Sequence, residues 1–398
     1  MGERIFCALL CLALAVVLAL TSGCELFGIG DNSIMVMTYN VHNLFDDIHD
    51  GSEYPEFVPG EKWDRSAYLD RLDDIGRVIR GVSGTFGRGP DIVVLTEVEN
   101  ANVVNDLRNL VLGERLYPVA LATEVDGNAI QIGLLSRLPV KSIRVHGAYP
   151  FNDERIRPVL EAELVLPNEP GRGLHLLATH WPSKIGGEAE TEPLRVQVAS
   201  VIARRAAELA ASRPQDMVLV AGDLNQTLPA DIDNCFGDPE NLEEPCWAGE
   251  TAGLRSLCAA CPAAIQQWGE SPSDTAPRAA ITPAVTTTAP AAKMSPLLVT
   301  HNLAAASENP LVWYSPWDLS QSPGSYVYQQ EWERIDHFLL GAGLAGSDYY
   351  PADFWVEVRE WMCTPSGYPR AYRPSQRTGL SDHFPLVLEL RPAKPQAR

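Results

Sequence analysis

Positive charge is scarce in this sequence. Of the 398 residues, 31 are Lys or Arg and 51 are Asp or Glu, so the formal net charge is −20 at pH 7. This balance argues against a protein that holds nucleic acid through an overall positive field, but it is compatible with an enzyme whose local phosphate site recruits a cation. With 45% hydrophobic residues, 9 Trp and 12 Tyr, the composition excludes a disordered or low-complexity chain.

Signature motifs of several enzyme classes are also missing. No glycine-rich phosphate loop and no GxSxG motif follows an expected strand, which argues against a nucleotide-binding fold and a serine hydrolase. Cys258 and Cys261 are spaced like zinc ligands, but no second pair has that spacing. A structural disulfide is therefore favoured over a zinc or redox site.

The first residues are predicted to be an export signal rather than part of the fold. Residues 5–20 form an apolar run that is short for a membrane span and typical of a signal peptide. The small residues before Cys24 resemble a bacterial lipoprotein cleavage site. We therefore expect residues 1–23 to be a lipoprotein-type signal peptide and residues 24–33 to be a tether.

The alternatives at this end are cleavage near Gly23 without lipidation, or an uncleaved anchor. In each case the chain is expected to be exported. The leading expectation is a cell-envelope lipoprotein, held to a membrane by a lipid anchor on Cys24, on the periplasmic side or the outer surface.

Export would permit disulfide bonds. The cysteines that follow Cys24 are odd in number: Cys235, Cys246, Cys258, Cys261 and Cys363. Two bridges and one free thiol are the simplest arrangement, with the connectivity left open.

Short apolar runs alternate with two helical patterns along the mature chain. Apolar residues at helical spacing predict helices over 68–79 and 194–209. Strands are predicted at residues 34–39, 91–95, 130–135, 159–166, 174–178, 216–221, 338–340 and 385–390.

The alternating pattern breaks from about residue 226 to 310. This stretch carries four of the cysteines, and residues 271–296 within it include five Pro, seven Ala and five Thr. We interpret residues 226–310 as a surface insertion in a single domain, and we expect 271–296 to be dispensable.

Polar side chains flank the ends of six expected strands. Four strands end in Asn40, in Glu97, in His180, and in Asp223 with Asn225, and two begin with Asp336 and with Asp382 and His383. If all these groups lie on one rim, the first four strands run toward it and the last two away from it. This requires a mixed or antiparallel sheet rather than an all-parallel one.

The oxygen ligands on this rim suit a hard cation. Glu97 and Asp382, with the amide oxygen of Asn40, form a set that favours Mg²⁺, with Mn²⁺ or Ca²⁺ as alternatives. Asp and Asn after a strand usually form turns, so the combination rather than any single residue supports this interpretation.

The remaining rim residues suit attack of water on a phosphoester. His180 and His383 can donate to a phosphoryl oxygen, and Asp223 can activate or position water. Catalysis of such reactions depends mainly on stabilisation of the negative charge on the phosphoryl oxygens, and a bound metal ion contributes to this stabilisation.

Six segments resemble, in order, motifs of the endonuclease/exonuclease/phosphatase superfamily. They are TYNVHNLFD, VVLTEVEN, ATHWPSK, VAGDLN, ERIDHFLL and LSDHFPLVL, and they span residues 35–390 except the insertion. The resemblance implies an α/β fold, namely a four-layer α/β/β/α sandwich of two packed mixed or antiparallel sheets. We expect this domain to cover residues 34–391, followed by a tail at 392–398.

Residue roles follow from the same resemblance. It implies that Asn40, Glu97 and Asp382 surround the metal and that His180 and His383 contact the scissile phosphate.

The resemblance also implies supporting roles for four further residues. Asp336 would orient His383, and Asp223 with Asn225 would handle water and the phosphate. Arg157 occupies the place of the family's Arg ahead of the His strand, with a surface Arg at a strand start as the alternative.

The implied activity is divalent-metal-dependent phosphoester hydrolysis. The segments TEVEN, HWPSKIGG and GLSDHFPL look most like exported bacterial nucleases. We therefore expect a monomeric Mg²⁺-dependent nuclease that cleaves phosphodiester bonds of DNA or RNA. The alternatives are a sphingomyelinase-like phospholipid hydrolase, an inositol- or sugar-phosphate phosphoesterase, and an inactive binding or adhesion lipoprotein.

Three local expectations complete the sequence analysis. Asp336 is predicted to pair with His383 rather than His337, because neighbours on a strand point to opposite faces. The acidic loop at 46–50 is interpreted as solvated charge, with a structural Ca²⁺ site as the alternative. The aromatic residues between 313 and 332 are interpreted as core, with base stacking or membrane contact as alternatives.

Overall fold

The computed structural model describes residues 32–84, 87–147, 155–167, 169, 171–228, 254–256, 297–345 and 349–393. The predicted signal peptide, Cys24, most of the tether, the four cysteines between 235 and 261, and the expected dispensable segment 271–296 lie outside these residues. Among the helices in the described ranges, none is long and apolar enough to cross a membrane. Cys363 is described, and it has no disulfide partner among the residues that the structure describes.

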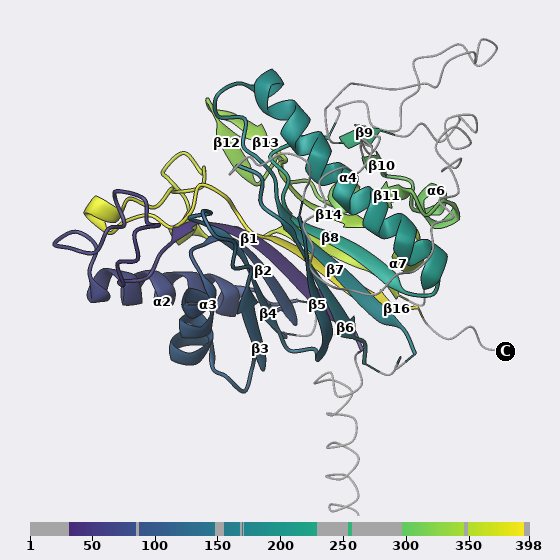
Figure 1. The fold of residues 1–398 in the computed structure, drawn as a ribbon, viewed down its shortest axis with the longest axis horizontal. Coiled ribbons are helices and arrows are strands. Elements are labelled where there is room, and N and C mark those ends of the chain that lie inside the picture. Colours follow the sequence, from purple (N-terminus) through teal and green to yellow (C-terminus); the bar gives the residue numbers. More distant parts are fainter. Residues whose placement is uncertain are drawn as a thin grey trace, which may run out of the picture.

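Two mixed sheets pack face to face at the centre of the fold (Figure 1). The first sheet has the order β15 (Tyr349–Val356), β16 (Leu386–Pro392), β1 (Ile34–Leu44), β2 (Ile92–Val98), β4 (Gln131–Ser136) and β3 (Val119–Ala122). The second has the order β5 (Val140–His146), β6 (Val159–Val165), β7 (Gly173–His180), β8 (Met217–Asp223), β14 (Asp336–Leu340), β11 (Val312–Tyr314), β10 (Leu297–Thr300) and β9 (Leu254–Ser256). A separate hairpin consists of β12 (Tyr326–Tyr328) and β13 (Glu331–Glu333).

Helices cover the outer faces of both sheets. Figure 1 shows α2 (Arg65–Gly81) and α3 (Ala101–Asp106) on one side of the pair of sheets and α4 (Glu188–Ser212) on the other. The short helices are the π turn Leu107–Leu112, α6 (Leu303–Glu308), α7 (Ala342–Ala345), and the 3-10 turns Pro316–Leu319, Glu360–Met362 and Pro374–Gln376. The arrangement is the four-layer α/β/β/α sandwich that the resemblance implies.

Strand direction confirms the rim argument. β1 runs parallel to β2, and β7 runs parallel to β8, and a hydrogen bond from Asn40 to Asp223 joins the two pairs, so these four strands end on one rim. β16 is antiparallel to β1, and β14 is antiparallel to β8, so both begin there. The sheets are therefore mixed, as predicted.

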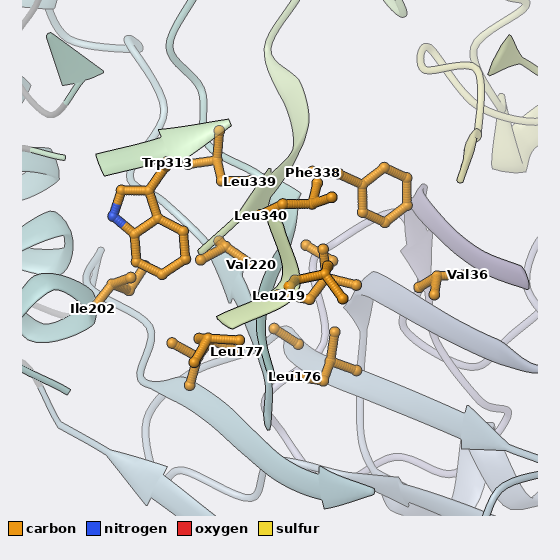
Figure 2. Close-up of a cluster of buried hydrophobic side chains, with 14 of the residues drawn as sticks. Val36, Leu176, Leu177, Ile202, Leu219, Val220, Trp313, Phe338, Leu339 and Leu340 are labelled. Atoms are coloured by element: carbon orange, nitrogen blue, oxygen red, sulfur yellow. The ribbon is translucent and has the colours of Figure 1, made fainter. Parts of the chain in front are cut away.

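The core between and around the sheets follows the alternation of side chains along each strand. In Figure 2, Leu176, Leu219 and Phe338 lie toward Val36 of the first sheet, whereas Leu177 and its neighbours lie toward α4. On the other side of the first sheet, the alternate residues of β1 and β2 pack against α2. The central strands of each sheet are thus covered on both faces, which explains their nearly continuous hydrophobic runs.

Both predicted helical patterns form helices. Asp64 caps α2 by accepting a hydrogen bond from the Ala67 N–H at 2.9 Å. The buried face of α2 includes Tyr68, Leu72, Ile75 and Ile79, and that of α4 includes Leu194, Val198, Val201, Ile202 and Leu209, as their spacing predicts.

The end of the predicted insertion requires a correction. Residues Leu297, Leu298 and Val299 are buried, and β10 pairs in parallel with β11. Residues 297–310 therefore belong to the second sheet and its covering helix α6 rather than to a surface excursion. Three apolar residues followed by Thr300, without alternation, give little strand signal beside a Pro-rich segment.

Trp313 and Trp317 are buried, in agreement with a core role for that part of the aromatic stretch, whereas Tyr328 is exposed.

A buried charge network joins the outer face of the second sheet to α4. Glu161 on β6 is 1% exposed and accepts from His175 at 2.8 Å, from His146 at 2.6 Å and from Arg205 of α4 at 2.7 Å. Burial favours the protonated carboxyl, but the hydrogen bonds from these three partners prevail and hold the pKa of Glu161 far below its usual range. The ionised carboxylate therefore links β5, β6, β7 and α4.

Replacing this carboxylate is expected to destabilise the fold. Glu161→Gln should lower the free energy of unfolding by about 3 kcal/mol, because it removes the buried carboxylate charge that Arg205 and two histidines share. Urea unfolding followed by circular dichroism measures the change. Since the folded-state pKa is depressed, the difference from wild type should be full at neutral pH and shrink as acid protonates Glu161.

The matched control is Glu208→Gln, because Glu208 pairs with the same Arg205 at 3.0 Å but its side chain is 56% exposed. This change should cost less than about 1 kcal/mol. Equal effects of the two substitutions would contradict the proposed role of Glu161.

Candidate active site

All nine predicted site residues lie at the rim where the strands meet. In the second sheet, His180 pairs in register with Asp223, and Asp223 pairs in register with Asp336. In the first sheet, Asn40 on β1 lies opposite Thr96 on β2, directly before Glu97. The strand-end positions of the sequence therefore converge in space.

Asn40 connects the two sheets. Its Nδ2 donates to Oε1 of Glu97 and to Oδ2 of Asp223, both at 3.0 Å. Its Oδ1 accepts from the His42 N–H at 2.9 Å. Asn40 thus lies beside Glu97, as predicted, but its amide nitrogen rather than its oxygen faces the carboxylates, so it orients them.

His383 pairs with Asp336, as predicted. Nδ1 of His383 lies 2.8 Å from Oδ2 of Asp336, and the Ser325 hydroxyl donates to the same oxygen at 2.6 Å. His337 points to the opposite face, where its Nε2 lies 2.8 Å from the Gln226 carbonyl oxygen. The pairing crosses the sheets, because Asp336 begins β14 and His383 leads into β16.

The protonated form of His383 is strongly favoured. Burial opposes the charged imidazolium, but the carboxylates of Asp336, Asp223 and Asp382 outweigh it and raise the pKa of His383 well above its usual value. Its Nε2 lies 3.9 Å from Oδ2 of Asp223. The ring therefore carries a positive charge into the site.

His180 has the opposite preference. Burial lowers the pKa of His180 well below its usual value, and the charges of Arg157 and His383 add to this effect. Its Nε2 lies 3.7 Å from Asp223 and 3.9 Å from Glu97, while its Nδ1 is buried with no hydrogen-bond partner among the described residues. The ring is therefore a neutral group, able to donate or accept a single hydrogen bond at each nitrogen.

Asp223 titrates near neutral pH. Burial raises its pKa to about 7, and the adjacent Asp336 carboxylate adds to the shift, while His383 and hydrogen bonds from Asn225 and Asn40 limit it. The Asn225 N–H donates to Oδ1 of Asp223 at 2.8 Å. A carboxylate with this pKa is suited to accept a proton from water at physiological pH.

Two site residues have left-handed backbone conformations. Glu97 has φ 65° and Asn225 has φ 48°, which L-residues seldom adopt and which cluster at functional sites. Gly222 of the GDLN segment has φ 148°, and a side chain there would collide with the Thr179 carbonyl. The glycine therefore allows β7 and β8 to bring His180 and Asp223 together.

Arg157 belongs to the site rather than to the surface. It precedes β6, its guanidinium hydrogen-bonds the Tyr54 hydroxyl, and it acts electrostatically on Glu97 and Asp223. Burial lowers its pKa, and its Nε has no hydrogen-bond partner among the described residues. The Arg157 guanidinium therefore places a positive charge near the carboxylates of Glu97 and Asp223.

The donor set fits a hard divalent cation. Ser381 donates to the Asn40 carbonyl at 2.7 Å, which ties the segment that carries Asp382 to β1. The side chains of Glu97 and Asp382 are 17% and 34% exposed, so both carboxylates are reachable from solvent. Oxygen donors of this kind favour Mg²⁺, Mn²⁺ or Ca²⁺ over softer ions.

Asp223, Asp336 and His383 form a second group with ligand atoms within 4.8 Å of one another. The Asp336 oxygen that contacts His383 is already engaged, so this trio is better explained by its hydrogen bonds than by an ion.

Several contacts of the site were not predicted from the sequence. Tyr54 reaches Arg157 from the loop after β1, and Ser325 supports Asp336 from the segment before β12. Tyr326 lies against His383, with ring centroids 4.7 Å apart. Tyr54 and Ser325 come from loops and Tyr326 from the three-residue strand β12, and none of these segments carries a clear strand-end signal.

The sequence matches a family model described as the Endonuclease/Exonuclease/phosphatase family over residues 35–233. This range includes six of the predicted site residues and ends before Asp336, Asp382 and His383. A search of curated protein sequences finds no match.

Solved structures of similar fold have low sequence identity. Truncated TDP2 from Caenorhabditis elegans is 14% identical with a TM-score of 0.47, over 90% of this chain and 98% of that one. A functionally unknown conserved protein from Enterococcus faecalis is 14% identical with a TM-score of 0.48, over 90% and 100%. An endonuclease/exonuclease/phosphatase from Bacteroides vulgatus is 13% identical with a TM-score of 0.46, over 90% and 99%.

The two rim histidines are expected to differ in protonation. In ¹⁵N NMR of the metal-free protein at neutral pH, His383 should show the imidazolium signature and His180 the neutral one. Asp336→Asn should move the His383 titration to lower pH, because it removes the charge that most favours the imidazolium. The control is Asp70→Asn, which removes an exposed carboxylate of α2. Identical His383 titrations in wild type and Asp336→Asn would refute the pairing.

Proposed function

The chain belongs to the Endonuclease/Exonuclease/phosphatase family, and we propose that it is a divalent-metal-dependent phosphoester hydrolase whose active site is the shared rim of the two sheets. The observation that carries this proposal is the pairing of charged His383 with Asp336 beside a buried Asp223 whose pKa is about 7. One group is thus prepared to stabilise negative charge, and the other to take a proton.

The residues divide the reaction between them. Asp223 accepts the proton of the attacking water, and hydrogen bonds from Asn40 and the Asn225 N–H fix the direction of its carboxylate. The imidazolium of His383, held by Asp336, faces the phosphoryl oxygens and stabilises the charge that develops on them. The neutral imidazole of His180 donates a hydrogen bond to a phosphoryl oxygen.

Glu97 and Asp382 would hold the metal ion, which when bound neutralises phosphoryl and leaving-group oxygens. Asn40 keeps Glu97 in place, and Arg157 adds a fixed positive charge near both Glu97 and Asp223. The ion expected at this oxygen set is Mg²⁺.

Our leading substrate proposal is a nucleic acid phosphodiester. Its support is the resemblance of the TEVEN, HWPSKIGG and GLSDHFPL segments to exported bacterial nucleases. Export through residues 1–23 and lipid anchoring at Cys24 are part of the same proposal, and they rest on the sequence alone. We propose that the enzyme acts as a monomer in the cell envelope.

The second candidate substrate is a smaller phosphoester, and the acidic net charge of the chain favours it. The net charge is −20. Lys184, in the loop that follows His180, is paired with Glu188 at 3.1 Å and lies 4.0 Å from Glu333. A long polyanion gains little from such a surface. A phospholipid head group or an inositol or sugar phosphate needs only the local site.

Activity should depend on Glu97 and on a divalent ion. Glu97→Gln is expected to lower turnover by about 1,000-fold with the fold intact, because it removes a charged metal ligand. Chelation should abolish wild-type activity and added Mg²⁺ should restore it. Exposed Glu124→Gln is the control and should retain full activity. Full turnover in excess chelator would contradict the proposed mechanism.

The substrate classes are separated by assaying one preparation on plasmid DNA, RNA, sphingomyelin and inositol phosphates, each with Mg²⁺ and with chelator. Cleavage of DNA or RNA alone supports the nuclease, and turnover of a lipid or small phosphoester alone supports the second candidate. No Mg²⁺-dependent turnover of any substrate would favour the inactive binding protein.

A further inference from the structure

We infer that the chain carries a structural Ca²⁺ site, separate from the proposed catalytic ion, formed by Asp50, Glu53 and Glu99. Each of these residues offers a carboxylate oxygen, and the three oxygens lie within 4.8 Å of one another. Calcium–oxygen distances are about 2.3–2.6 Å, so a single ion can contact all three.

The environment of the Glu99 side chain indicates a bound cation. It is 4% exposed, and its Oε1 has no hydrogen-bond partner among the described residues. Its Oε2 accepts from the Asp46 N–H at 2.7 Å. A buried carboxylate oxygen without a partner is costly unless something cationic completes it.

The surroundings supply little positive charge. Among the described residues, the one ion pair found for these carboxylates joins Glu53 to His49, at 3.0 Å, and His49 is an exposed side chain. Backbone N–H groups of Asp50 and Gly51 donate to Glu53 and fix its carboxylate. The neighbouring Asp47 is occupied by Arg65 at 2.9 Å, so it is not part of the site.

The ligand chemistry favours Ca²⁺ over other cations. The donors are carboxylate oxygens without a thiolate, which disfavours soft metals. Mg²⁺ usually binds proteins through one or two carboxylates and keeps most of its water, whereas Ca²⁺ accepts several carboxylates from a loop in irregular geometry. Water and backbone carbonyls would complete the coordination.

The site would join two segments that carry catalytic groups. Glu99 follows Glu97 by two residues, and Glu53 directly precedes Tyr54, whose hydroxyl contacts Arg157. Tyr54 also packs on Phe45, with ring centroids 5.3 Å apart. A bound ion would therefore fix the loop after β1 relative to the end of β2.

The test is calorimetric titration of the purified full chain with CaCl₂ in saturating Mg²⁺, combined with thermal melting. Wild type should show one Ca²⁺ binding event, and saturating Ca²⁺ should raise Tm by about 3 °C or more. Asp50→Asn and Glu53→Gln should each weaken this event by at least about 10-fold, because each removes a ligand charge.

Two controls identify the site. Glu56→Gln removes an exposed charge from the same loop and should bind Ca²⁺ as wild type does. Glu97→Gln should also keep the event, because it alters only the catalytic ion. Asp50 is exposed, so Asp50→Asn should fold, and its Ca²⁺-free melt verifies this.

Unchanged Ca²⁺ affinity in both Asp50→Asn and Glu53→Gln would overturn the inference. So would loss of the event in Glu97→Gln, which would assign it to the catalytic centre, or absence of any Ca²⁺ event in wild type. Because the readouts are binding and Tm, these outcomes are independent of whether the chain hydrolyses phosphoesters.

Discussion

The two hydrogen bonds from Asn40 fix the relation between the sheets at the point where chemistry is expected. One goes to Glu97 of its own sheet and the other to Asp223 of the opposite sheet, both at 3.0 Å. Without them, two like-charged carboxylates would face each other across the seam. The second cross-sheet bond, between His383 and Asp336, has the same effect for the other half of the rim. The same hydrogen bonds therefore hold the two sheets together and orient the residues of the site.

This constraint explains why so acidic a chain can have a site for phosphate. Four carboxylates gather at the rim, and the balancing groups there are the His383 imidazolium and the largely buried Arg157. Burial and, to a smaller extent, repulsion by Asp336 raise the pKa of Asp223, and the gathered acids favour recruitment of a cation. The positive charge that the sequence lacks as a whole is therefore supplied locally by ionised residues and, in the proposed mechanism, by a bound metal ion.

Most of the scaffold could be predicted because buried strands have strong apolar runs and because polar residues marked their ends. Strand direction followed from which end of each strand carries the polar residues, and the choice of His383 over His337 followed from the two-residue period of a strand. The loop contacts could not be predicted in this way. Tyr54, Ser325 and Glu99 reach their partners from segments without period, and the donor role of Asn40 depends on the orientation of one amide. The strand β10 could not be predicted for a related reason, because four residues are too few to establish a pattern.

The central claim is that groups from both sheets act as one catalytic unit. A double-mutant cycle on kcat/KM, with the best substrate, tests it most directly through His383→Ala, Asp336→Asn and the double variant. Each single change should lower kcat/KM by about 100-fold or more, and the double variant should be little worse than the poorer single one, because Asp336 acts through His383. Fully multiplicative losses would show that the two residues act independently and would contradict the account.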